Sequence, residues 1–406
     1  MRCSIHGMKS VRASFISNGQ LPYRYMRNLL LILSVLLFSV SAWAQELILQ
    51  GHVVDAETGE VLPYATVYVS EGRGTLTNAD GEFKLKVQPQ DLLTFSYVGY
   101  EKLYIKAAEL PNEIKMKAFQ QMLKEVTVKP VDDMNILEQV IKNLKQDYSK
   151  HKKERQGYFL RALMQNQEDS YLIECFLTGR SAVNLRETET LSGMSGMNAE
   201  GKESSIGMTS TNIHRLAEIG ACTYQSTYWQ DAIKPLSSMA TIKKYYKMKV
   251  ETIYGSEGEK LYRITFRWNN EHIRSVENRR YLTGTAFVDV TTLHLLRFEG
   301  EVGNAYQWID FQRTPTTIKF HINYDYTKGY AAISNLGIQG GNEKMNYRCL
   351  LFNIQDDSLF ATSTGFAEDN ILNAVDKANY DSTLWERYNI VKRTKDEERA
   401  AFSKEE

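Results

Sequence analysis

A run of short alternating segments between Leu49 and Lys129 constrains the fold of this chain more than any other feature of the sequence. From Ala65 to Val69, apolar residues alternate with Thr and Tyr, and this period of two gives a strand one apolar face. Turn-forming sequences at Asp55–Gly59 and Asn78–Gly81 separate such segments. Short strands at this spacing predict an antiparallel β-sandwich.

A secretory signal pattern precedes this run. Arg27 supplies a basic start, Leu29–Val40 an apolar core, and Ala42–Ala44 a cleavage site with small residues. We expect translation to start at Met26 and residues 1–44 to be an extension and signal peptide. The apolar core is shorter than the roughly 20 residues of a membrane-spanning helix, and no cysteine follows the cleavage site to carry a lipid. The pattern predicts an exported chain without a transmembrane span.

Five groups of residues within the run carry a resemblance to a known family. They are Gly51–Asp55, Thr58–Gly59, Leu62–Val67, Thr77–Phe83 and Leu93–Tyr100. Together they resemble the carboxypeptidase-regulatory-like domain. The resemblance implies a transthyretin-like sandwich of the seven-stranded type over residues 45–129, as found near the N-terminus of exported Bacteroidetes proteins. Leu123–Val128 also resembles the strand that closes this module in outer-membrane TonB-dependent receptors, but the rest of the chain is too short for a receptor of that plan.

The sequence after the sandwich predicts a second, larger domain. Apolar residues from Ile136 to Leu144 recur at helical spacing, which predicts a linker helix within residues 130–156, capped by Asp132 or Asp133. Residues 157–375 are expected to form an α+β domain dominated by a long-stranded antiparallel sheet, and 376–406 a charged tail that is frayed or helical. The expected strands are Tyr158–Met164, Tyr171–Leu177, Tyr246–Tyr254, Lys260–Trp268, Tyr281–Val290, Leu293–Val302, Thr316–Thr327 and Arg348–Ile354.

Two segments of this region are interpreted as irregular. Ser192–Ser210, rich in Gly, Ser, Met and Thr, is predicted to be a loop, and Gly337–Asn342 a turn. The order of helix, strand pair and meander resembles an uncharacterised region that follows the regulatory-like module in Bacteroidetes envelope proteins. The turn after Asp289 is also similar to the curved sheets of lipoprotein-carrier domains. Overall, the chain is expected to be mainly β.

Composition excludes some partners. With 49 basic and 49 acidic residues the formal net charge is zero, so no basic field exists to attract nucleic acid. Three cysteines follow the signal, Cys175, Cys222 and Cys349, and they lack any Cys-x-x-Cys spacing. Buried single thiols are the expectation, with one disulfide left open.

The candidates for chemistry are isolated residues. His151 and Glu154 have the spacing of a zinc pair, with His272 as a distant third ligand, but flanking lysines favour a solvated helix end instead. Ser195 lacks the Gly-x-Ser-x-Gly spacing of a nucleophile elbow. Asn78 beside Asp80 could offer oxygens to calcium, although such residues more often stabilise a turn.

One aromatic cluster, Tyr224, Tyr228 and Trp229, could form a binding platform, although packing over a sheet edge is favoured. The sequence assigns no catalytic, cofactor-binding or metal residue and no cofactor.

We therefore expect a non-catalytic, exported cell-envelope protein, in the periplasm or associated with the outer membrane, that binds or scaffolds an envelope protein or a glycan. One alternative is a periplasmic carrier with an apolar ligand inside the curved sheet and Ser192–Ser210 as a lid. A second alternative is a hydrolase, which would need His214, His272, Asp289 and Glu301 to meet in one cleft.

Overall fold

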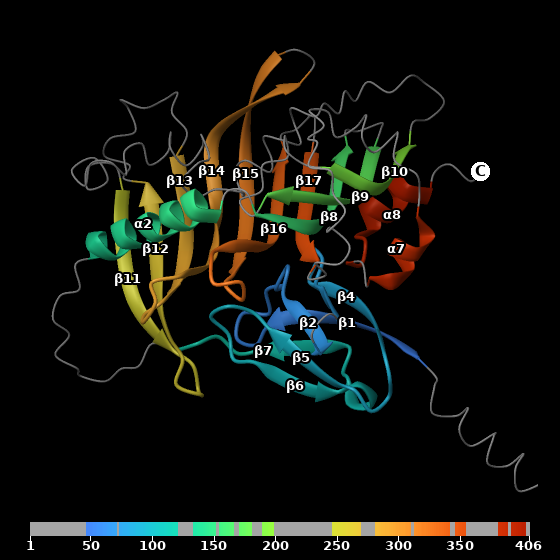
Figure 1. Ribbon diagram of the computed structural model, residues 1–406, viewed down its shortest axis with the longest axis horizontal. Helices are drawn as coiled ribbons and strands as arrows, with labels where there is room; N and C mark the ends of the chain where they lie inside the picture. Colours follow the sequence, from blue (N-terminus) through green and yellow to red (C-terminus); the bar gives the residue numbers. More distant parts are fainter. Residues whose placement is uncertain are drawn as a thin grey trace, which may run out of the picture. The chain divides into compact units, whose positions relative to one another are not determined.

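Strands dominate the computed structural model of the chain (Figure 1). The structure describes residues 46–70, 73–120, 133–151, 154–165, 170–180, 189–198, 246–268, 281–309, 312–341, 346–354, 381–388 and 391–402. The predominance of strands confirms the prediction of a mainly-β fold. Leu123–Val128, Cys222 and the signal segment lie outside the described residues.

The first group of strands is the expected seven-stranded sandwich. Its strands are β1 (Leu47–Asp55), β2 (Thr66–Ser70), β3 (Arg73–Leu76), β4 (Glu82–Val87), β5 (Leu92–Ser96), β6 (Leu103–Lys106) and β7 (Glu113–Met116), with a 3₁₀ turn, η1 (Ala107–Glu109). One sheet has the order β4-β1-β7 and the other β3-β2-β5-β6. Val67, Phe83, Leu93 and Phe95 are fully buried in its core.

The sandwich departs from the prediction in one pairing. β1 and β7 run parallel, with His52 opposite Glu113, so the sandwich is not wholly antiparallel. Parallel neighbours need a long crossover connection, and the five strands between β1 and β7 supply it. Both predicted turns are confirmed: Asp55 Oδ1 accepts from the backbone N–H groups of Glu57 and Thr58, and Gly81 has a φ of 76°.

The predicted helix is α2 (Asp133–His151). It buries the apolar positions named from the sequence, Ile136, Leu137, Val140, Ile141 and Leu144, each at 8% exposure or less. Asp147 near its end accepts a hydrogen bond from Ala331 N at 3.1 Å, which ties the helix to the start of a distant strand.

The second group of strands forms one ten-stranded sheet with the order β10-β9-β8-β17-β16-β15-β14-β13-β12-β11. The strands are β8 (Arg155–Gln165), β9 (Ser170–Arg180), β10 (Glu189–Asn198), β11 (Tyr246–Tyr254), β12 (Lys260–Trp268), β13 (Tyr281–Asp289), β14 (Leu295–Ile309), β15 (Gln312–Asp325), β16 (Ala332–Gly341) and β17 (Asn346–Ile354). The predicted hairpin and meander are confirmed, and each described pairing is antiparallel.

Two predictions of irregular structure are wrong. Gly337–Gly341 belongs to the central strand β16, and Ser192–Asn198 to the edge strand β10. In both cases pairing with a neighbouring strand outweighs a weak local strand preference, which tertiary context routinely does. The rest of the predicted loop, after Asn198, lies outside the described residues.

The ten-stranded sheet has one apolar and one polar face. One row across eight strands is apolar and at most 4% exposed: Ile264, Ala286, Phe298, Ile322, Leu336, Leu351, Leu160 and Cys175. On the opposite face the corresponding row runs Thr285, Glu299, His321, Gly337, Leu350, Arg161 and Glu174. Several of these polar side chains are nevertheless buried, which shows that other parts of the chain cover this face.

The C-terminal segment is one such cover. It contains α7 (Ser382–Arg387) and α8 (Lys395–Phe402), and α8 packs against β9 and β10 (Figure 1). Trp385, Val391 and Ala400 are buried. The tail was expected to be frayed or helical, and its described part contains these two helices.

Cys175 and Cys349 are buried free thiols, as expected for single packed cysteines. Within the described residues, no helix is both long and apolar enough to cross a bilayer.

Candidate functional site

A pocket of about 460 Å³ lies where loops of the sandwich meet the polar face of the sheet. Both belong to one compact unit, Ile48–Glu406. Pro63, Tyr64 and Ala79 line the pocket on the sandwich side. The sheet side consists of Thr283, Gly284, Thr285, Glu299, Gly300, Glu301, Lys319, Phe320, His321, Gly337 and Gln339. We call this contact region the seam and the hollow the seam pocket.

The wall of the pocket depends on Tyr64, which has a φ of 62°. This left-handed conformation is unfavourable for a tyrosine by about 1–2 kcal/mol, so its surroundings must hold it. Tyr64 N donates to Thr77 O at 3.1 Å, and the Thr77 hydroxyl both accepts from Ala65 N at 2.9 Å and donates to Leu62 O at 2.7 Å. Strained residues held in this way are often found at functional sites.

The ring of Tyr64 is seated on Gly337 of β16. A Cβ atom at position 337 would lie 2.1 Å from Tyr64 Cε2, so only glycine leaves room for the ring. Tyr64 is 7% exposed and packs with Leu76, Leu350 and Val391. The glycine that suggested a turn in the sequence therefore marks a close approach of another part of the chain.

Two rows of side chains form the sheet side of the pocket. Thr283, Glu301, Lys319 and Gln339 are successive partners across β13 to β16, and so are Thr285, Glu299, His321 and Gly337. The first row is half-buried or exposed and forms the rim, whereas His321 in the second row is 5% exposed and lies in the floor.

His321 and Glu299 form a hydrogen bond in this floor. His321 Nδ1 lies 3.1 Å from Glu299 Oε2, and Nε2 lies 3.1 Å from Asn323 Nδ2. Because an amide nitrogen can only donate, Nε2 accepts and Nδ1–H donates to Glu299. Burial lowers the pKa of His321, and the hydrogen bond to Glu299 opposes this only in part. The imidazole is therefore neutral at pH 7.

Glu299 is ionised. Burial by itself raises its pKa, but the Arg297 charge and the His321 hydrogen bond outweigh burial and hold the pKa at about 2. Arg297 Nη2 lies 3.2 Å from Glu299 Oε1.

Arg297 is sandwiched between aromatic rings from both parts of the seam. Its guanidinium lies 4.2 Å from the ring centre of Tyr97 in the sandwich and 4.0 Å from that of Phe287 in β13. Its Nε and Nη1 atoms are buried without a hydrogen-bond partner, so cation–π contacts replace hydrogen bonds there. Gly99, with a φ of 87°, leaves room for the same Phe287 ring.

This arrangement suits binding better than proton transfer. Both ring nitrogens of His321 already have protein partners, so neither is available to a bound molecule. By contrast, no hydrogen bond or ion pair among the described residues uses the side chains of Glu301, Lys319 or Gln339 on the rim. No group of three or more His, Cys, Asp or Glu side chains within the described ranges could hold a metal ion.

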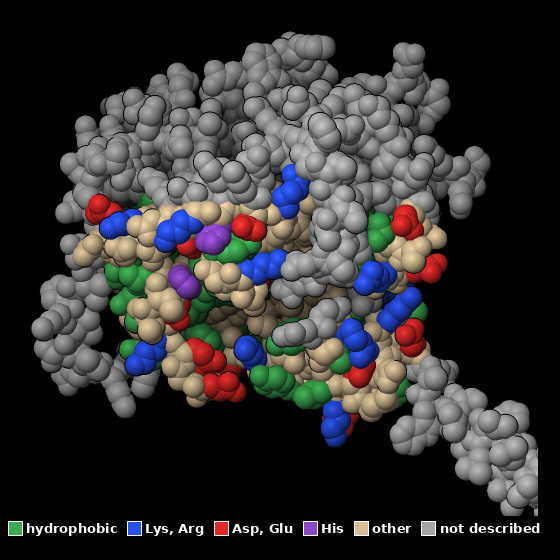
Figure 2. Space-filling model, viewed as in Figure 1, with side chains coloured by type: hydrophobic (Ala, Val, Ile, Leu, Met, Phe, Trp, Pro, Cys, Tyr) green, Lys and Arg blue, Asp and Glu red, His purple; other side chains and the backbone are tan. Residues whose placement is uncertain are grey.

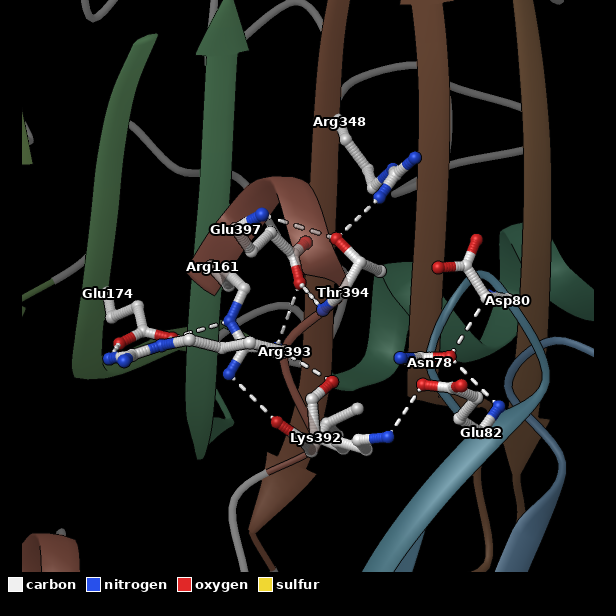
Figure 3. Close-up of polar contacts among 11 residues, drawn as sticks. Asn78, Asp80, Glu82, Arg161, Glu174, Arg348, Lys392, Arg393, Thr394 and Glu397 are labelled. Atoms are coloured by element: carbon white, nitrogen blue, oxygen red, sulfur yellow. Dashed lines mark hydrogen bonds and ion pairs between the residues drawn. The ribbon is translucent and has the colours of Figure 1, made fainter. Parts of the chain in front are cut away.

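A second polar cluster on the same face fastens the C-terminal segment, and Figure 3 shows Arg161 and Arg393 converging on Glu174. Arg161 Nε donates to Glu174 Oε1 at 2.5 Å, and Arg161 Nη2 donates to Val391 O at 2.8 Å. Burial by itself raises the pKa of Glu174, but the two arginines lower it below its usual value. Lys392 then reaches the sandwich, where its Nζ lies 2.7 Å from Glu82 Oε2. We call residues 391–397 the clasp.

Charged side chains of both signs are interspersed over the described part of the face in Figure 2. The described surface of this face has no large patch of one charge sign, in line with the zero formal net charge of the chain.

Those residues considered for chemistry from the sequence that the structure describes have other roles or lie apart. His151 stacks on Tyr330 with 4.2 Å between ring centres, so it is not simply a solvated helix end. Asn78 Oδ1 accepts from the backbone N–H groups of Asp80 and Glu82, which uses it in the turn. Ser195 lies in β10.

The hydrolase constellation is not assembled by its described members. Asp289 Oδ1 accepts from Thr292 N at 2.7 Å in the turn after β13. Glu301 is the cross-strand partner of Thr283, which precedes Asp289 by six residues in β13. Glu301 and Asp289 are therefore about 20 Å apart. His214, His272 and the aromatic cluster Tyr224, Tyr228 and Trp229 lie outside the described residues.

Sequence reasoning missed most of the seam. Tyr64 was part of a motif that signalled a strand, and Arg297, Glu299 and His321 appeared as polar positions of alternating strands. The signal that could have indicated a close approach is Gly337 inside a segment of strand length.

Comparisons with known proteins agree with the N-terminal prediction. Residues 49–128 match the family described as the CarboxypepD_reg-like domain. The chain is 34% identical over 101 residues to the TonB-dependent receptor SusC of Bacteroides thetaiotaomicron, which covers 25% of this chain and 10% of the receptor. The regulatory-like domain predicted from the sequence is therefore confirmed, and the match spans a tenth of the receptor's length.

Similarity to solved structures is low. An outer-membrane lipoprotein-sorting protein domain from Vibrio parahaemolyticus aligns at 10% identity with a TM-score of 0.21, covering 56% of this chain and 99% of that one. MucB in complex with MucA(peri) aligns at 5% identity with a TM-score of 0.15, covering 52% and 93%. Scores this low establish no shared fold.

Proposed function

We propose that this protein is a non-catalytic, exported protein of the cell envelope, in the periplasm or associated with the outer membrane, and that it binds its partner at the seam pocket. The signal pattern at residues 26–44 supports export. The similarity of the N-terminal domain to that of a TonB-dependent receptor supports the envelope as its place of action.

One observation supports the binding role. The sandwich and the polar face of the sheet together line a pocket, and the rim side chains of Glu301, Lys319 and Gln339 have no hydrogen bond or ion pair among the residues that the structure describes. The volume of about 460 Å³ is in the usual range for a small-molecule site. The strained Tyr64, its seat on Gly337 and the buried Arg297 fix the walls before any ligand arrives. Preorganised walls favour affinity because little further ordering is needed on binding.

The non-catalytic part of the proposal rests on the chemistry of the floor. Glu299 is held ionised by Arg297, and His321 is neutral with both ring nitrogens occupied. A general acid or base needs a proton-transfer atom within reach of the ligand, and these groups are engaged with each other instead.

The experiment that tests this function is fractionation of the native host, followed by crosslinking at the pocket. We expect the protein in the envelope fraction, and we expect a photo-crosslinking residue at Gln339, on the rim, to capture a molecule. The same residue at Glu113, an exposed position of β7 in the sandwich, is the matched control and should capture nothing specific. A cytosolic protein would contradict the proposal, as would equal capture at both positions.

The opposite face of the sheet favours one second candidate, a periplasmic carrier of an apolar molecule. The row from Ile264 to Cys175 is apolar over eight strands and buried throughout. Native mass spectrometry of protein from its own host is the test, and a co-purified lipid of defined mass would support the carrier. Protein without bound lipid would count against it.

A further inference from the structure

The rim of the seam pocket has a charge pattern that points to one class of ligand. We infer that the pocket binds a small zwitterion of the α-amino acid type, with its ammonium group on Glu301 and its carboxylate on Lys319. This inference rests on the proposed binding function and specifies the ligand of the same pocket.

Two oppositely charged rim residues lie on neighbouring strands without forming an ion pair. Glu301 and Lys319 are direct partners across β14 and β15, and opposite charges at such positions usually interact. Neither side chain has an ion pair among the described residues, although in the next row the partners Glu299 and His321 do bond, at 3.1 Å. Within the described part of the chain, the rim therefore presents one anion and one cation on neighbouring strands, neither of them in an ion pair.

The charges that line the seam pocket balance one another. Arg297 compensates Glu299 in the floor, and Glu301 and Lys319 cancel each other on the rim. A pocket without net charge gives no electrostatic advantage to a phosphate or a polyamine. A ligand with one charge of each sign meets both rim charges and restores a partner to each.

The rim charges also favour a zwitterion over a neutral polyol. Thr283, Thr285 and Gln339 can hydrogen-bond either ligand. A polyol, however, would cover Glu301 and Lys319 without a counter-charge, and covering an unpaired charge is costly. The rim charges therefore favour the zwitterion.

The remaining wall accounts for the ligand's side chain. Pro63, Tyr64 and Ala79 form a mainly apolar surface opposite the charged row. Tyr64 is fixed by Thr77 and Gly337, so this surface is rigid. An amino acid bound through its two charged groups would place its side chain against this wall.

The test is isothermal titration of the full exported protein with amino acids, monosaccharides and inorganic phosphate. We expect amino acids to bind, and Glu301→Gln or Lys319→Met to weaken binding about tenfold or more, as for loss of a charged hydrogen bond. Glu113→Gln and Lys115→Met make the same changes in an exposed ion pair of the sandwich and should leave binding unchanged within about twofold.

Modified ligands assign the two ends. An N-acetylated amino acid lacks the ammonium group, so we expect it to bind weakly and with no further loss in Glu301→Gln. An amino acid amide lacks the carboxylate and should be insensitive to Lys319→Met.

The inference is overturned if sugars or phosphate bind and amino acids do not, or if the two rim variants bind amino acids as the natural protein does. These outcomes leave the envelope role intact when fractionation and crosslinking at Gln339 succeed. Failure of fractionation, in contrast, would remove the proposed function itself.

Discussion

Replacing Gly337 by alanine tests the seam most directly. The new Cβ would lie 2.1 Å from Tyr64 Cε2 and 2.2 Å from Cζ. Ordinary contact begins at 3.4 Å, so the ring or the strand must move by at least 1.3 Å, the difference between 3.4 and 2.1 Å. The ring cannot swing away freely because Leu350 and Val391 enclose it. Overpacking of this kind costs about 1–3 kcal/mol, and we expect Gly337→Ala to lower the free energy of unfolding by about 2 kcal/mol.

A double-mutant cycle shows whether the cost comes from the Tyr64 ring. Tyr64→Ala alone should cost about 3–5 kcal/mol, as for other large aromatic truncations in a core. In that background Gly337→Ala should cost almost nothing, because the clashing atoms are gone. The assay is urea unfolding of the four proteins, and the expected interaction energy is about 2 kcal/mol.

Additive effects would refute the reasoning. Independent sites add to within about 0.5 kcal/mol. If Gly337→Ala costs the same with and without the Tyr64 ring, or costs nothing in the natural protein, the ring does not occupy the space over Gly337 and the pocket wall is wrongly assigned.

Three further predictions concern buried charges and the cap of α7. Glu174→Gln should lower the free energy of unfolding by about 3 kcal/mol in urea titrations, because it removes the carboxylate from the buried Arg161 and the partly buried Arg393. Asp396→Asn, in an exposed pair, should cost less than about 1 kcal/mol. The folded pKa values of His321 and Glu299 both lie below their unfolded values. The contribution of these two groups to the free energy of unfolding should therefore be complete above about pH 6.5 and decrease as the pH falls towards about 2. Thermal unfolding measured against pH tests this, and His321→Gln should flatten the curve just below about pH 6.5. A flat curve for the natural protein would contradict it. Asp381 Oδ1 accepts a hydrogen bond from Thr383 N at 3.0 Å and so caps α7. Asp381→Ala should remove this cap and lower the free energy of unfolding by about 1 kcal/mol; unchanged hydrogen exchange in α7 would argue against it.

Local patterns predicted much of the fold because they act over a few residues. The helical spacing of Ile136, Val140 and Leu144 predicted α2 and its buried side. The alternation in Lys260–Trp268 predicted β12 with the bounds that the structure has. Strand β16 was missed because its glycines resemble turn signals when read without the strands on either side.

The candidate site was predictable only in part. Alternation marks Arg297, Glu299 and His321 as the polar side of their strands, and such residues usually face solvent. In the structure Tyr97 of the sandwich covers them, stacking on His321 with 5.6 Å between ring centres. Nothing in the local sequence distinguishes a solvated polar face from one that another domain covers.

By itself, the sequence determined the sandwich with its family resemblance, the helix α2 and the long antiparallel strands, because period and turn chemistry depend on near neighbours. Only the tertiary structure decided that Tyr64 sits on Gly337, that Arg161 reaches the clasp more than 200 residues away, and that the pocket exists. These contacts join distant residues, and their energies depend on burial and charge partners that exist only after the chain has folded.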